Sequence, residues 1–261
     1  MGDMLELEYD EDMISLLEAV WGEGFLSPGG TEEVDRVVGN KDLSQASILD
    51  IGCGIGGAAI HLARTRQPGR VTGIDIEENL VHKAQELANK KNVSAICHFQ
   101  RVDPGPLPFQ PCSFDVVFSK DSIIHIADKF SLAKNIYEVL RNDGWFIGSD
   151  WLSGYEGEPS PRMQAYIDAE GLDFDLASAR TYQEAFNAAG FVDVEIDERN
   201  AWYRNQARVE RDNLAGPLYE RLVAQVGEDF LNREIDVWDK MIIVLDSGEL
   251  RPTHLRARKP A

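Results

Sequence analysis

Residues 48–57 read Ile-Leu-Asp-Ile-Gly-Cys-Gly-Ile-Gly-Gly, a short apolar run that passes directly into closely spaced glycines. The run predicts a buried strand, and the pattern of residues 56–65 predicts a helix directly after it. Glycine lets the backbone approach a ligand closely, and a helix N-terminus offers unpaired N–H groups. The stretch therefore predicts a strand–loop–helix unit that binds a nucleotide-like ligand.

The same alternation of strands and helices continues on both sides of this unit. We expect strands at residues 47–51, 70–74, 95–100, 115–119, 144–150, 192–196 and 253–258, and helices at residues 56–65, 79–90, 130–140 and 181–189. Strands that alternate with helices of about ten residues indicate right-handed crossovers and a parallel sheet covered on both faces. The predicted fold is a doubly wound α/β protein with a mostly parallel, seven-stranded, Rossmann-like sheet.

Other helical stretches fall outside this alternation, at residues 10–38, 160–172 and 204–240. We expect them to form a helical lid over one edge of the sheet. Residues 1–40 are predicted to be an N-terminal lid over cofactor and substrate. Residues 41–261 are predicted to be the core, with helical insertions at about 153–180 and 200–245.

Composition excludes several classes of function. The 261 residues contain 26 Lys and Arg against 45 Asp and Glu, a net charge of -19. Without a basic cluster, neither nucleic acid nor an anionic membrane surface is an expected partner. No apolar run approaches the ~20 residues of a membrane span, and the acidic N-terminus does not resemble a signal peptide. Three scattered cysteines have no metal-ligand spacing, so we expect no metal and a cytoplasmic protein.

The glycines alone fit two cofactors. Gly52, Gly54 and Gly57 match the dinucleotide pattern G-x-G-x-x-G, with Asp75 ending the next strand. Asp50, however, would repel a pyrophosphate but suits the ammonium and sulfonium of S-adenosylmethionine (SAM). Asp103, after the following strand, is placed to accept the hydrogens of an adenine amino group. This ordered set favours SAM over NAD.

Together, these residues resemble the motif set of class I SAM-dependent methyltransferases over residues 44–150. The resemblance implies SAM as cofactor and S-adenosylhomocysteine as product. It implies that Asp75 binds the ribose hydroxyls and that Ile76 and Val102 enclose the adenine. It also implies a cofactor loop that contains Gly52, Cys53 and Gly54, with Cys53 as a small residue and not a nucleophile.

Two further stretches resemble phosphoethanolamine N-methyltransferases: Tyr9-Asp10 with residues 20–30 (Val-Trp-Gly-Glu-Gly-Phe-Leu-Ser-Pro-Gly-Gly), and residues 119–129 (Ser-Lys-Asp-Ser-Ile-Ile-His-Ile-Ala-Asp-Lys). That resemblance implies that Ser27 and Ser119 contact the cofactor. It also implies that Tyr9, Asp121 and His125 are the catalytic residues beside the substrate amine. His125 is suited to accept a proton or orient the nucleophile. We expect Asp121, four residues earlier, to lie on the same helical face.

The resemblance breaks at the family's phosphate site. Where that family has Tyr, Arg and Tyr, this chain has Tyr166, Glu170 and Leu172. A carboxylate in place of a guanidinium would repel a phosphate. We therefore expect a small zwitterionic acceptor, methylated on nitrogen or sulfur: an amino acid, a glycine or sarcosine-type amine, or the methionine thioether, with a role in osmolyte (betaine) synthesis.

The expected substrate contacts are one arginine for a carboxylate and aromatic rings for an onium group. They are Trp151, Tyr166, Trp202, Tyr203 and Arg204. The alternatives are a phosphoethanolamine-type N-methyltransferase and a non-catalytic SAM-binding module. The expected partner is a small molecule, and the protein is expected to be a monomer or homodimer.

Overall fold

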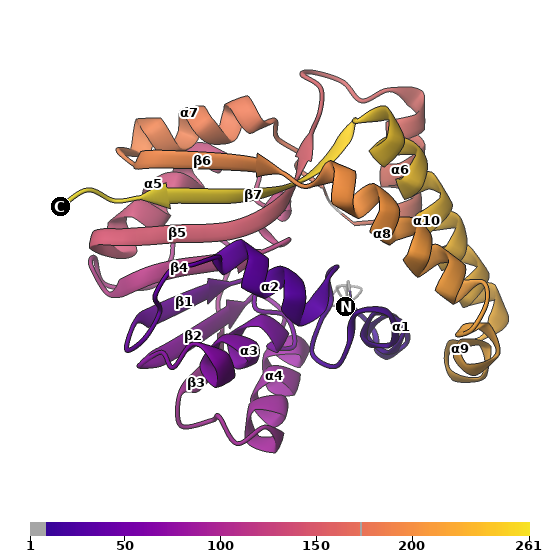
Figure 1. The fold of residues 1–261 in the computed structure, drawn as a ribbon, viewed down its shortest axis with the longest axis horizontal. Helices are drawn as coiled ribbons and strands as arrows, with labels where there is room; N and C mark the ends of the chain where they lie inside the picture. Colours follow the sequence, from indigo (N-terminus) through magenta and orange to yellow (C-terminus); the bar gives the residue numbers. More distant parts are fainter. Residues whose placement is uncertain (1–8, 173) are drawn as a thin grey trace, which may run out of the picture.

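A seven-stranded sheet forms the centre of the computed structural model, which describes residues 9–172 and 174–261 (Figure 1). The strands are β1 (Ser47–Ile51), β2 (Arg70–Asp75), β3 (Cys97–Arg101), β4 (Phe114–Lys120), β5 (Leu140–Ser153), β6 (Val192–Glu198) and β7 (Leu250–Arg258). Their order across the sheet is β3-β2-β1-β4-β5-β7-β6. Only β7 runs antiparallel to its neighbours, so the predicted mostly parallel sheet is confirmed.

Helices cover both faces of the sheet. They are α2 (Gly30–Val38), α3 (Gly57–Thr65) and α4 (Glu78–Lys90) on one side, and α5 (Lys129–Val139) and α7 (Ala179–Ala189) on the other. Adjacent strand residues alternate between these layers: Ile48 packs with α2 and α3, while Leu49 packs with α5. Because both faces are buried, the strands consist of nearly continuous apolar residues.

The remaining helices pack together beyond the carboxyl ends of the parallel strands (Figure 1). They are α1 (Glu11–Trp21), α6 (Pro161–Glu170), α8 (Asn200–Leu214), α9 (Tyr219–Val226) and α10 (Glu228–Ser247). Glu210 is buried at their centre, where it accepts hydrogen bonds from Trp21, Trp238, Tyr203 and Gln206. We refer to these helices together as the lid.

The N-terminal part of the chain contributes to both regions. Helix α1 packs against α8 and α9, whereas α2 packs against α3 and β5. Residues 1–8 lie outside the described residues. The division into a lid at residues 1–40 and a core at residues 41–261 therefore stays a prediction.

A buried ionic cluster joins the sheet to the lid. Glu33 of α2 lies 2.7 Å from His254 Nε2 of β7 and accepts a hydrogen bond from Arg199, which precedes α8. Although burial raises the pKa of Glu33, the hydrogen bonds from His254 and Arg199 lower it below its ordinary value overall. The cluster fixes one end of α8 against the sheet.

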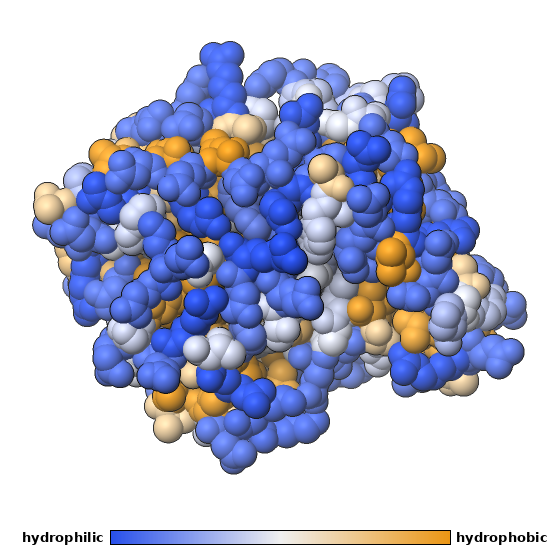
Figure 2. Space-filling model, in the orientation of Figure 1, coloured by the Kyte–Doolittle hydropathy of each residue, from blue (hydrophilic) through white to orange (hydrophobic). Residues whose placement is uncertain are grey.

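The surface of the molecule is mostly hydrophilic on the face drawn in Figure 2. Apolar residues lie there in small scattered groups. Across residues 9–172 and 174–261, no helix has the length and apolar character needed to cross a bilayer.

We predict that Glu33→Gln lowers the free energy of unfolding by about 1–3 kcal/mol at pH 7, because it leaves the half-buried guanidinium of Arg199 without its charged partner. Glu32→Gln, at an exposed position on the same helix, is the matched control and should change stability by less than about 0.5 kcal/mol. Urea denaturation measures both variants.

The pH dependence should separate them as well. Since the pKa of Glu33 is lowered on folding, its contribution is complete above its ordinary pKa of 4.5 and is lost as the pH falls through the folded value. The difference between wild type and Glu33→Gln should therefore shrink below pH 4.5. An unchanged difference down to acid unfolding contradicts this assignment.

Candidate active site

A cavity of about 830 Å³ opens where the carboxyl ends of β1 and β4 separate. The chain leaves β1 toward α3 on one face of the sheet and leaves β4 toward α5 on the other. Ligands of doubly wound proteins bind at this switch point because no crossover covers it. The cavity is lined by the glycine loop, the end of β2, the segment after β3, residues 24–27 and residues 120–128.

The glycine loop turns sharply over the end of β2. The N–H groups of Gly52 and Cys53 both donate to the Ile74 carbonyl oxygen, at 2.9 and 3.0 Å. Gly52 has φ +67, and a Cβ built there would lie 1.6 Å from Ser122 Oγ. A larger residue would thus displace the segment that follows β4.

Two buried carboxyls lie beneath the loop. Asp50 is 1% exposed and its Oδ2 has no hydrogen-bond partner; burial, with the nearby charge of Asp75, raises its pKa to about 8. Asp75 accepts from Gly54 N at 2.8 Å and Glu77 N at 3.2 Å, yet burial raises its pKa overall. Because Asp50 is buried and accepts no hydrogen bond on Oδ2 from the described residues, a cation is the partner that would best stabilise its ionised form.

One part of the cavity wall is apolar. Ile76 is 50% exposed although it is a large aliphatic residue, and Val102 lies across the same cavity. Asp103 also borders it and forms an ion pair with Arg101 at 2.6 Å. The residues predicted to enclose an adenine are thus brought to one cavity.

Lys120 joins the N-terminal segment to the other end of the cavity. Its buried ammonium donates to Ser27 Oγ at 2.7 Å, to the Pro28 carbonyl at 2.8 Å and to Asp121 Oδ2 at 2.7 Å. Asp121 Oδ1 accepts from Ser149 Oγ at 2.8 Å. The sequence analysis assigned no role to Lys120. A lysine at the end of an otherwise apolar strand could have indicated one.

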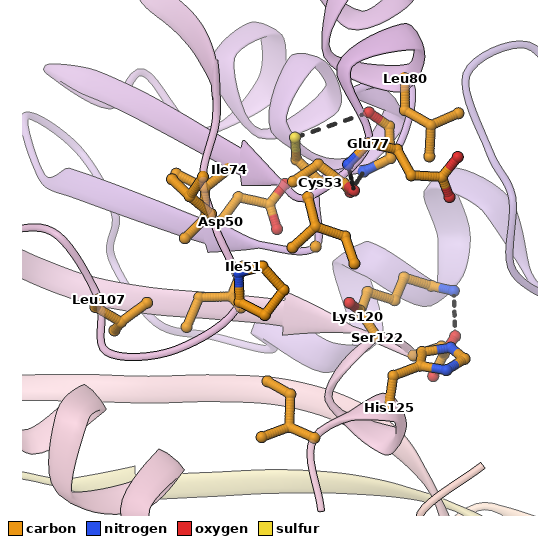
Figure 3. Close-up of a pocket in the computed structure, with 18 of the residues that line it drawn as sticks. Asp50, Ile51, Cys53, Ile74, Glu77, Leu80, Leu107, Lys120, Ser122 and His125 are labelled. Atoms are coloured by element: carbon orange, nitrogen blue, oxygen red, sulfur yellow. Dashed lines mark hydrogen bonds and ion pairs between the residues drawn. The ribbon is translucent and has the colours of Figure 1, made fainter. Parts of the chain in front are cut away.

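His125 lines the same cavity as Lys120 and Asp121, on the side away from Leu107 in Figure 3. Its ring packs against Phe174, with centroids 5.8 Å apart. The expectation that Asp121 and His125 share a helical face is wrong. Asp121 has φ +55, and only Ile123–His125 form a short 3₁₀ turn, η1. Asp121 is oriented by Lys120 and Ser149 instead.

Two buried groups, which the sequence analysis did not identify, bind the backbone of the turn that carries His125. Lys129 Nζ donates to the carbonyl oxygens of Ile123 and Ile124, at 2.9 and 3.3 Å. Asp150 accepts from Ile124 N at 3.1 Å and from the Tyr182 hydroxyl. Burial raises the pKa of Asp150 to about 7. These contacts fix the position of His125 in the cavity.

The other predicted residues are placed as follows. Tyr9, Ser27, Gly52, Cys53 and Gly54 line the large cavity. Ser119 does not: it is fully buried in β4 and its hydroxyl donates to the Ile51 carbonyl. The pKa of the Cys53 thiol is raised by burial and by both nearby aspartates, which keeps it protonated.

The predicted substrate residues separate into three groups. Trp151, Trp202 and Tyr203 line a second cavity of about 20 Å³, which Asp121 also borders. Tyr166 is buried in the lid. Arg204 borders neither cavity, because its guanidinium pairs with Asp246 of α10 at the surface. A carboxylate in the large cavity would therefore lack the arginine that we expected to bind it.

No group of three or more potential metal ligands occurs in the described part of the chain.

Comparison with known proteins identifies relatives for most of the chain. Residues 42–198 match the family model described as a methyltransferase domain. A phosphoethanolamine N-methyltransferase of Triticum aestivum is 30% identical over 251 residues, which are 94% of this chain and 47% of the relative. The chain thus spans about half the length of that relative. The O-methyltransferase cnsE of Penicillium expansum is 31% identical over 203 residues, 73% of this chain and 72% of the relative.

A solved structure is similar as well. Phosphoethanolamine N-methyltransferase 2 of Haemonchus contortus, in complex with phosphomonomethylethanolamine and S-adenosylhomocysteine, superposes with a TM-score of 0.87 at 26% identity. The match covers 96% of this chain and 58% of that one.

The tight approach of Ser122 to the glycine loop yields a stability prediction. Gly52→Ala should lower the free energy of unfolding by about 1–3 kcal/mol more than Gly157→Ala does. Gly157 also has a positive φ, +82, but a Cβ there meets nothing within 4 Å, so this control isolates the clash from the backbone strain. Urea denaturation provides the comparison, and equal losses would contradict the contact.

Proposed function

Because the chain belongs to the methyltransferase-domain family and has the class I SAM-dependent methyltransferase fold, we propose that it methylates the nitrogen of a small amine. The observation that carries this proposal is one cavity with Asp50 and Asp75 under the glycine loop and Tyr9, Asp121 and His125 at its wall. SAM, the cofactor of this family, supplies a methyl group on a positively charged sulfur and leaves as S-adenosylhomocysteine.

The residues of the cavity fit this cofactor. Asp50 has a buried oxygen without a partner, which is suited to a cationic group. Each oxygen of Asp75 accepts a backbone hydrogen bond, and a carboxylate has lone pairs for further donors such as ribose hydroxyls. Ile76 and Val102 provide apolar surfaces for an adenine, and Asp103 an acceptor near it.

The other residues would act on the amine. A reacting amine must be neutral, and the imidazole of His125 is suited to receive its proton or orient it. Asp121, held by Lys120 and Ser149, would stabilise the cationic product. Tyr9 would close the cavity and accept a hydrogen bond. These groups contribute mainly by positioning the nucleophile.

Two classes of acceptor remain for the assay. The relatives favour a phosphoethanolamine-type amine over the small zwitterion expected from the sequence. Arg204, the expected carboxylate ligand, is occupied by Asp246. A phosphate is disfavoured because few cations line the large cavity. Its lysines are Lys120, which is bound to Asp121, and Lys134 on α5.

Incubation with SAM and phosphoethanolamine, ethanolamine, glycine, sarcosine and short diamines should yield S-adenosylhomocysteine and an N-methylated product with at least one of them. Mass spectrometry identifies the methylated atom. Absence of transfer to every amine by protein that binds SAM would contradict the proposed function.

His125→Asn should lower kcat by about 100-fold or more, because it removes the group that receives or orients the amine proton. The dissociation constant for SAM, measured by calorimetry, should stay within about twofold. His82→Asn, at an exposed position of α4, is the control and should leave kcat unchanged. Equal rates for the two variants would exclude His125 from the reaction.

Binding of SAM should release a proton from Asp50. A bound cation favours the ionised carboxylate, whereas the pKa of Asp50 is about 8 without it. The affinity for SAM should therefore weaken by up to about tenfold per unit as the pH falls below 8. Calorimetry in two buffers of different ionisation enthalpy measures the proton; Asp50→Asn should bind more weakly, with no pH dependence from this site.

A further inference from the structure

Lys120 and Ser149 lie opposite each other at the last paired position of β4 and β5. Directly after Lys120 the chain turns away from the sheet, because Asp121 has a left-handed backbone with φ +55. The Asp121 N–H donates a hydrogen bond to the Ser149 carbonyl oxygen at 2.8 Å. The backbone of Asp121 is therefore fixed against β5 at the point where the chain leaves β4.

The side chain of Asp121 is bound by the same two residues. Its Oδ1 accepts a hydrogen bond from Ser149 Oγ at 2.8 Å, and its Oδ2 accepts one from Lys120 Nζ at 2.7 Å. Because each oxygen has a donor from the protein, the plane of the carboxylate is defined before any ligand binds. A carboxylate has about four acceptor positions, so lone pairs remain for the N–H groups of an amine.

The ammonium of Lys120 is fully engaged by the protein. Its three N–H donors match three acceptors among the described residues: Ser27 Oγ at 2.7 Å, the Pro28 carbonyl oxygen at 2.8 Å and Asp121 Oδ2 at 2.7 Å. The side chains of Lys120 and Asp121 are 4% and 10% exposed, so solvent screens their attraction only weakly. Lys120 is thus placed to orient Asp121 and not to bind an anionic substrate.

Ser149 supports Asp121 from outside the large cavity. It is 5% exposed and lines the small cavity of about 20 Å³, whereas Asp121 borders both cavities. Ser149 is absent from the described residues that form the wall of the large cavity, where His125 lies. A change of the Ser149 hydroxyl therefore affects an amine beside His125 only through Asp121.

We propose that Ser149 and Lys120 are positioning residues of the acceptor site, which hold the Asp121 carboxylate in the orientation that binds the N–H groups of the amine. This proposal rests on the proposed function. A carboxylate that is already oriented loses little rotational freedom when the amine binds, so its interaction with the amine is stronger. Because Ser149 has no access to the cofactor, loss of its hydroxyl should weaken binding of the acceptor and leave binding of SAM unchanged.

Steady-state kinetics of Ser149→Ala with SAM test this role. KM for the amine that the wild type methylates fastest should rise about tenfold, with a smaller change in kcat, because the hydrogen bond that orients Asp121 is lost. The dissociation constant for SAM should stay within about twofold. Ser153→Ala is the matched control, since Ser153 lies on the same strand, is 6% exposed and donates to the Tyr155 carbonyl oxygen at 2.9 Å. An equal rise in KM for the two variants would overturn the role.

A double-mutant cycle determines whether Ser149 acts through Asp121. Asp121→Asn should raise KM at least as much as Ser149→Ala, and the double variant should exceed Asp121→Asn by less than about twofold. Effects that multiply would overturn the proposal. Lys120→Met is a second variant should Ser149→Ala fail to fold, and it should weaken the amine more than SAM. Loss of SAM affinity alone in Lys120→Met would overturn its positioning role and assign the ammonium to the cofactor.

A binding measurement separates this inference from the proposed function. Ethanolamine and phosphoethanolamine are titrated by calorimetry into protein saturated with S-adenosylhomocysteine, which requires no turnover. Binding that weakens about tenfold in Ser149→Ala, but not in Ser153→Ala, supports the positioning role even when neither amine is methylated. Equal binding by the wild type and Ser149→Ala, in a protein that methylates an amine, overturns the positioning role and leaves the proposed function intact. Absence of both binding and transfer overturns both.

Discussion

The divergence of the chain after β1 and β4 is the constraint on which the candidate active site depends. Parallel strands place their carboxyl ends at one edge of the sheet, and α3 and α5 then leave toward opposite faces. The edge between them cannot be closed by either helix. It is closed instead by a segment from the N-terminal part of the chain. Lys120 donates hydrogen bonds to Ser27 and Pro28 of this segment and to the carboxylate of Asp121.

The buried carboxyl groups differ in whether the protein itself supplies their hydrogen-bond donors or leaves an oxygen for a ligand to bind. Glu33 and Glu210 are surrounded by donors from the protein, and each joins elements that are distant in sequence. Asp50 instead keeps a buried oxygen to which no group in the described part of the chain donates. An uncompensated buried acceptor is costly, so such groups are expected where a ligand supplies the missing donor. Asp50 lines the large cavity.

Much of the fold was predictable because its signals are local. Glycines follow β1 and an aspartate ends β2, and α3 and α4 begin within a few residues of them. The ranges 47–51 and 56–65 therefore agree with β1 and α3 to within one residue. The turn at Ile123–His125 was not predictable in this way, because its conformation is maintained by Lys129 and Asp150 from neighbouring elements. Aspartate adopts the left-handed backbone more readily than most residues, but residue type alone does not place it at Asp121.

The sequence by itself determined the doubly wound sheet, the glycine loop and the acids below it, because periodicity, glycine and strand-end carboxylates act over a few residues. The tertiary structure alone decided which distant side chains meet. In the folded chain Arg204 pairs with Asp246, and the Ser119 hydroxyl bonds within the sheet. Trp151, Trp202 and Tyr203 line a separate small cavity that Asp121 also borders. The physical reason is that partners for a charge or a ring come from packing between helices, and the spacing of residues along one helix does not specify its neighbour.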